Sequence, residues 1–168
     1  MDWILILSKA FWCGWGAVGF AILFNVPPRT LLAIWIGGAV GGFLKFSLLQ
    51  IGAGVVLASF AGALAIGISS IPIAHFRHAP PMIFAIPSVI PMIPGVFAYR
   101  TMLGLMKLTG NIGADYNLII AETVNNGSKT LFVILALSMG VAVPMHLMRQ
   151  ESVKNIRLHK RRGEVVKG

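Results

Sequence analysis

Five long apolar runs dominate this sequence, and they constrain its fold more than any other feature. The runs occupy residues 3–24, 30–49, 51–74, 80–99 and 130–148. Each is close to the about 20 apolar residues that a helix needs to cross a bilayer. Charged residues make up 11% of the chain, well below the roughly 25% of a soluble domain. We therefore expect an all-α integral membrane protein with about five transmembrane helices.

The number of spans depends on the run at 30–49, because Lys45 interrupts it. Its uninterrupted apolar part is about 14–15 residues long, which is short of a full crossing. If this run does not cross, four spans remain and both ends of the chain are cytoplasmic. The lysine itself either faces a cavity, where it would attract an anionic substrate, or extends its ammonium to the membrane surface.

Basic residues give the expected orientation and the division of the chain. With five spans, the loops at Arg29 and Arg77 and the C-terminal tail share one side. Cytoplasmic segments carry an excess of Lys and Arg, so we expect this side, including the C-terminus, to be cytoplasmic. We divide the chain into a transmembrane helical domain, 1–148, and a basic cytoplasmic tail, 149–168, which anionic lipid would attract.

The fourth run contains prolines where a membrane helix needs backbone donors. Pro87, Pro91 and Pro94 each remove an N–H group and clash with the carbonyl four residues earlier, and Gly95 follows directly. We expect this helix to be broken by the prolines, with the chain unwound over 87–95. Unwound backbone inside a bilayer is tolerated where protein buries it or where it lines a cavity. The alternative is a proline kink that serves packing alone.

A transporter would use the groups that such a break sets free. Discontinuous helices of transporters place free backbone groups at a midplane substrate site. The N–H groups of Gly95, Val96 and Phe97 would start a new half-helix, whose partial positive charge suits a carboxylate. Arg100 lies about a turn and a half further along and could add a bidentate partner. Its alternative role is an anchor at the lipid headgroups.

Glycines at four-residue spacing predict close packing of the second and third helices. Such small residues let a second helix backbone approach closely. We expect helix interfaces at Gly37, Gly38, Gly41, Gly42, Gly54 and Gly62.

Two motifs resemble a known family. They are Phe24-Asn25-Val26-Pro27-Pro28-Arg29, and Ile90-Pro91-Met92-Ile93-Pro94-Gly95 followed by Tyr99-Arg100. Together with the length and order of the runs, they resemble the threonine/serine exporter family. The closer resemblance is to its small, separately encoded membrane subunit, which includes the succinate-exporter type.

This resemblance implies a subunit of the bacterial inner membrane that works with a larger membrane subunit. It implies export of small amino acids or dicarboxylates such as succinate, and it leaves open whether the complex is an oligomer. We assign substrate binding to the residues of the break and of the second motif, namely Pro87, Pro91, Pro94, Gly95, Tyr99 and Arg100.

Asp115 and Glu122 are the only acidic residues away from the two ends of the chain. A proton-coupled exporter needs a titrating group in its path, and carboxylates are the usual choice, so these two are the proton-coupling candidates. On a helix they would share one face with Asn126 and Lys129. The alternative is a solvated face of an external helix, which the loop-like sequence at 125–128 favours.

The sequence lacks the residues that other classes of function would require. The sequence shows no positioned serine–histidine–acid triad and no glycine-rich phosphate loop with a lysine, so we expect neither an enzyme nor direct use of ATP. His75 and His78 lack a third ligand, so we expect no metal and no other cofactor. The basic tail lacks interleaved aromatic residues, which argues against nucleic acid as a partner. The main alternative to a transport subunit is an assembly subunit whose glycine faces bind a larger partner.

Overall fold

The structure, a computed structural model, describes residues 3–77, 79–110 and 116–165, with side chains as far as residue 147. Every regular element within these ranges is a helix. In chain order they are α1 (Trp3–Leu23), the 3₁₀ helix η1 (Pro28–Thr30), α2 (Leu31–Gln50), α3 (Val55–Arg77), α4 (Pro81–Val89), the 3₁₀ helix η2 (Ile90–Met92), α5 (Gly95–Gly110) and α6 (Tyr116–Val165).

Within the described ranges, four helical segments are long and apolar enough to cross a membrane. They are α1, η1 with α2, α3, and the Tyr116–Leu147 part of α6. A fifth crossing exists if α4, η2 and α5 form one bent span. The expected all-α membrane fold with four or five spans is confirmed. Because Lys45 lies inside a continuous helix of 20 residues, the difference between four and five spans now depends on the bent pair.

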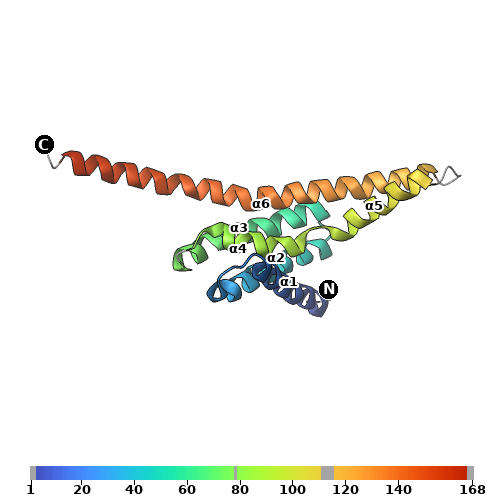
Figure 1. Ribbon diagram of the computed structural model, residues 1–168, viewed down its shortest axis with the longest axis horizontal. Coiled ribbons are helices and arrows are strands. Elements are labelled where there is room, and N and C mark those ends of the chain that lie inside the picture. Colours follow the sequence, from blue (N-terminus) through green and yellow to red (C-terminus); the bar gives the residue numbers. More distant parts are fainter. Residues whose placement is uncertain (1–2, 78, 111–115, 166–168) are drawn as a thin grey trace.

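The other helices pack around α4, the first helix of the bent pair. α2 lies between α1 and α3, and α3 packs against α6 (Figure 1). One cluster of buried apolar side chains joins α1, α2, α3 and α4, and a second joins α3, α4, η2 and α6. Because α4 contributes to both clusters, the segment that leads into the break lies at the centre of the fold.

The glycines of α2 and α3 lie where helix backbones approach one another closely. A Cβ at Gly38 would lie 2.7 Å from the Cβ of Ala17, and a Cβ at Gly42 would lie 2.9 Å from the Cβ of Cys13. Real Cβ atoms do not approach that closely, so larger residues would push α1 and α2 apart. Gly41 is crowded in the same way by Ile66 of α3, and Gly62 by Met92 of η2 and the Gly41 carbonyl of α2. The contact at Gly37 is less close, with its Cβ position 3.0 Å from the hydroxyl of Ser88 on α4.

Gly54 differs from the other glycines. It directly precedes α3, and its carbonyl accepts the N–H of Ala58 at 3.0 Å. No described heavy atom lies within 4 Å of the position that its Cβ would take. The expected packing at Gly54 is therefore not observed, because a four-residue spacing places residues on one face only inside a helix.

The loop-like sequence at 125–128 does not break the chain, because α6 continues through it. α3 likewise continues through Pro72. In α6, the Cβ position of Gly127 lies 3.3 Å from the methyl group of Thr101 on α5. Packing along a helix outweighs local turn preference, because most helical stability in proteins comes from tertiary contacts.

α5 and residues 116–129 of α6 form an arm, called the α5–α6 arm below. Figure 1 shows these two segments side by side, extending beyond the other helices. α6 has 50 residues, which is about 75 Å at 1.5 Å per residue. A helix of this length exceeds the roughly 30 Å hydrocarbon core, so α6 extends outside the bilayer. Its backbone is helical across the boundary drawn at 148, which is therefore not a structural break.

Candidate functional site

The proline break is narrower than the sequence indicates. Pro87 lies inside α4, and η2 continues the helical turns to Met92. Ile93 is extended, with φ −60° and ψ 136°, because the ring of Pro94 drives the preceding residue out of the helical region. Only these last two residues lie outside a helix, so the expected unwinding over 87–95 is wrong in extent.

The break changes the direction of the chain inside the apolar part of the molecule. The axes on its two sides differ by 53°. α4 has 9 residues and η2 has 3. Their combined rise is about 18–20 Å, so an α4 that starts at the membrane surface brings the break well inside a core of roughly 30 Å.

Three helices cover one side of the break, and each contributes a glycine. The contacts with α1, α2 and α3 pair Pro91 with Gly16, Ser88 with Gly37, and Met92 with Gly62. The first two place atoms 3.2 Å and 3.0 Å from the Cβ position of the glycine. This cover satisfies the requirement that irregular backbone inside a bilayer be buried in protein.

Lys45 supplies the charge at the break. Its Nζ donates a 2.7 Å hydrogen bond to the carbonyl of Met92, and the residue is 9% exposed. That carbonyl would pair with the N–H of Val96 in an unbroken helix. It also lies at the C-terminal end of a half-helix, where partial negative charge favours a cation. The lysine therefore caps the broken helix, a role that differs from both roles considered from the sequence.

Sequence reasoning missed this pairing because the two residues are 47 positions apart. The available signal was a cation inside one apolar run and freed carbonyls inside another. A lysine ammonium has three donors, and within the described residues the Met92 carbonyl is its one hydrogen-bond acceptor. The hydroxyls of Ser47 and Ser59, on α2 and α3, are also buried without a partner in the described part of the chain.

The start of α5 is less open than expected. The N–H of Gly95 donates to the carbonyl of Ile93 at 2.9 Å, and the N–H of Phe97 donates to the carbonyl of Pro94 at 3.1 Å. Two of the three N–H groups that were expected to be free for a carboxylate are thus paired. The bend itself brings these carbonyls close, so the positive charge at the break comes mainly from Lys45 rather than from the α5 N-terminus.

The other side of the break faces an apolar groove of about 330 Å³ between the broken helix and α6. Val89, Ile90 and Ile93 form one wall, and Ile134 and Leu137 belong to the other. The broken segment therefore lies between a charged, tightly packed side and an apolar groove.

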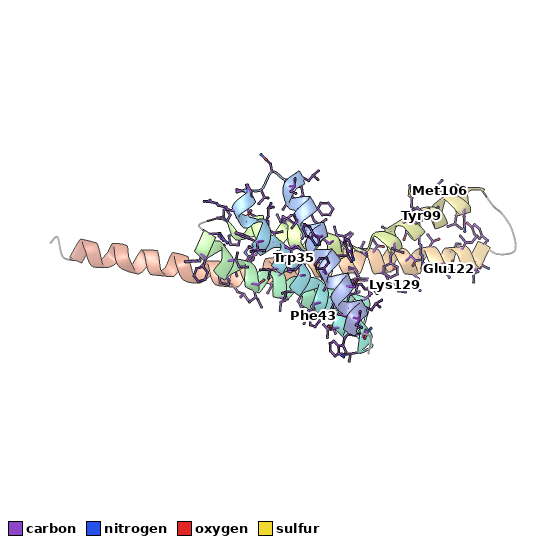
Figure 2. All side chains as sticks on the ribbon, turned by 90° about the horizontal axis from the view of Figure 1, so that it is seen from below. Trp35, Phe43, Tyr99, Met106, Glu122 and Lys129 are labelled. Carbon is purple, nitrogen blue, oxygen red and sulfur yellow. The ribbon has the colours of Figure 1, made fainter. Side chains whose placement is uncertain are left out.

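Tyr99 and Arg100 do not lie against the break. They are on the α5–α6 arm, where Tyr99 is exposed (Figure 2). Arg100 lines a separate polar pocket of about 510 Å³ between α5 and α6. Glu122 lines the same pocket, so the structure brings one substrate candidate and one proton-coupling candidate together. Asp115 lies outside the described residues.

The remaining lining of this polar pocket is also largely hydrophilic. The other residues are Leu103, Gly104, Lys107, Ile119, Thr123, Asn125 and Asn126. No group of three or more His, Cys, Asp or Glu suited to a metal ion occurs in the described part of the chain. The polar pocket can therefore bind a polar ligand through charge and hydrogen bonds.

Fold and site together define a multi-pass helical membrane protein with a bent, cation-capped pair of helices at its centre. The family described as "Threonine/Serine exporter, ThrE" matches residues 9–147. The chain therefore belongs to the threonine/serine exporter family, as its motifs indicated.

Among its relatives is a Haemophilus influenzae protein that is described only as uncharacterized. It is 32% identical, over 85% of this chain and 50% of that protein. The chain thus spans about half the length of this curated relative. No solved structure matches the chain.

Proposed function

We propose that this chain is one membrane subunit of an exporter that moves small amino acids or carboxylates out of the cell. Membership in the threonine/serine exporter family supports export by a membrane protein. A larger membrane subunit would complete the path. The Haemophilus influenzae relative extends well beyond the region that it shares with this chain, which supports a further part of the exporter.

The observation that carries the proposal is the hydrogen bond between Lys45 and the Met92 carbonyl. A buried ionisable group inside a membrane span is costly, and such groups commonly mark a substrate path. The ammonium holds the break now, and it has donors left for a carboxylate that reaches it. A substrate carboxylate would compete with the Met92 carbonyl, so its arrival would loosen the cap and let the two half-helices move.

Location and orientation follow from the same proposal. An exporter of this kind would lie in the bacterial inner membrane, with its basic C-terminal segment in the cytoplasm. Succinate, L-threonine and L-serine are the substrates to test first, since each carries a carboxylate that Lys45 could bind.

The test is efflux from cells that lack the chain. Cells are loaded with labelled L-threonine, L-serine or succinate, and efflux is followed after adding back the chain, the larger subunit, or both. We expect efflux of at least one substrate only when both are present. Efflux that is equally fast without this chain, at equal abundance of the larger subunit, would contradict the proposal.

The alternative of an assembly subunit has lost its main support. It relied on glycine faces that would be free to bind a partner. Gly37, Gly38, Gly41, Gly42 and Gly62 all lie against neighbouring helices of this same chain. The transport function is therefore the better supported of the two.

A further inference from the structure

The polar pocket of the α5–α6 arm is lined by charged residues that have no part in the break. Arg100 and Lys107 approach it from α5, and Glu122, Asn125 and Asn126 approach it from α6. Its volume of about 510 Å³ lies within the roughly 300–1,000 Å³ of small-molecule pockets. Among the described residues, these charged side chains form no salt bridge within the pocket, so both signs of charge remain available to a ligand.

We propose that this pocket binds a small zwitterion and distinguishes it from a dianion. The carboxylate would lie toward Arg100 and Lys107, the ammonium toward Glu122, and the two amides would supply further hydrogen bonds. A dicarboxylate of similar size would bring a second anionic group to Glu122. Like charges at such a site raise the free energy of binding, so Glu122 would select for the ammonium group.

The walls of the pocket are held by close packing, which gives it a defined shape. Gly104 of α5 lies directly against Thr123 of α6, and Gly127 lies against Thr101. These contacts run along the seam between the two helices. The hydroxyl of Thr123 also donates a 2.6 Å hydrogen bond to the carbonyl of Ile119 within α6. The two helices that carry the pocket residues are therefore in direct contact along this seam.

The pocket lies where it could select a substrate before or after that substrate passes the break. Glu122 lies on the arm that extends beyond the other helices (Figure 2). Arg100 is in the helix that continues directly from the break. The inference rests on the proposed exporter function, and it adds that the arm, rather than the break, decides between amino acids and dicarboxylates.

Binding is measured with the full chain in lipid nanodiscs by ligand-observed NMR titration. The probes are L-serine, 3-hydroxypropionate (which lacks the ammonium), ethanolamine (which lacks the carboxylate) and succinate. We expect L-serine to bind about tenfold or more tightly than each of the others, because a hydrogen bond to a charged group is worth about that factor. Equal binding of all four probes, or no binding of L-serine, would overturn the inference.

Variants test the role of Glu122. Glu122→Gln should weaken L-serine to the level of 3-hydroxypropionate and leave 3-hydroxypropionate unchanged, whereas Glu122→Asp should keep the preference. Ser128→Lys adds the same change in net charge at an exposed position of α6 outside the pocket lining, and it should have no effect. An unchanged preference in Glu122→Gln, or the same loss in Ser128→Lys, contradicts the assignment.

Efflux separates this inference from the proposed function. If cells export L-serine while Glu122→Gln keeps the full preference for it, the inference fails and the exporter function stands. If the nanodisc preference depends on Glu122 but cells export none of the probes, the exporter function fails and the site stands. Loss of all efflux in Glu122→Gln with binding unchanged would instead indicate proton coupling, and would overturn the inference.

Discussion

At the scale of single residues, the central feature is the hydrogen bond from the buried Lys45 ammonium to the Met92 carbonyl. This carbonyl has lost its own donor at the break of the helix, and Lys45 donates to it instead. A buried carbonyl that loses its donor costs about 1–3 kcal/mol. Removing the charge also removes the desolvation penalty of a buried ion, so the two effects on stability oppose each other. Function should therefore respond more strongly than stability.

Lys45→Met is the matching test. We expect efflux at equal abundance to fall about tenfold or more, because a charged hydrogen bond contributes about 1.5–3 kcal/mol, while the melting temperature in detergent changes little. Lys9→Met is the control, since Lys9 is a lysine of α1 whose ammonium lies 5.3 Å from the centre of the Phe46 ring of α2 rather than at the break. Equal efflux in the two variants would show that Lys45 has no special role.

Close packing at a glycine gives a second prediction at this scale. Gly38→Ala places a Cβ 2.7 Å from that of Ala17, and we expect a loss of about 1–3 kcal/mol in the free energy of unfolding. Gly19→Ala is the control, because no described atom lies within 4 Å of its Cβ position. In α1 that change should be neutral or stabilising by about 0.5–1 kcal/mol. Thermal unfolding of the purified chain compares the stability of the two variants. Equal losses of stability would rule out the contact with Ala17 as the cause.

At the scale of elements, the chain bends at Pro94 and not at Pro87. Pro87 and Pro94 look alike in the sequence, yet α4 passes through the first and ends before the second. The difference lies in tertiary packing. Pro87 is fully buried among the central helices, whereas the chain beyond Pro94 leaves them for the α5–α6 arm.

Straightening of the bend can be measured as a longer distance between two spin labels on either side of the break. Spin labels at Met82→Cys and Met106→Cys, both exposed positions, bracket the break in a Cys13→Ser background. A straight helix would separate these backbones by about 36 Å, and the 53° bend shortens this by roughly 4 Å. We expect Pro94→Ala to lengthen the distance, because it restores a donor for the carbonyl of Ile90, and Pro87→Ala to leave it unchanged. The same distance in both variants would mean that packing alone makes the bend.

At the scale of the whole molecule, the bent pair of helices determines on which side of the membrane each end of the chain lies. If the bent pair crosses the membrane, there are five spans and the two ends lie on opposite sides. If it enters and returns, there are four spans and both ends share one side. The length of α6 requires that part of it lie in water in either case.

Reporter fusions decide the topology. We expect green fluorescent protein at the C-terminus to fluoresce and alkaline phosphatase there to be inactive, because the basic C-terminal segment is retained in the cytoplasm. An N-terminal tag that is accessible from outside intact cells would establish five spans. An active phosphatase at the C-terminus would reverse the proposed orientation.

The sequence by itself determined the membrane class and the order of the helices, because apolar length and charge content act locally and independently of partners. It also predicted a proline break, which the structure confines to Ile93 and Pro94, and it pointed to close packing at Gly38, Gly41, Gly42 and Gly62 but wrongly at Gly54. Only the tertiary structure decided what surrounds the break. The pairing of Lys45 with Met92 and the shared pocket of Arg100 and Glu122 bring together residues that are separated in sequence, and the regular path through Pro87 lies where other helices bury it. Their geometry depends on how whole helices pack, and no local pattern contains that information.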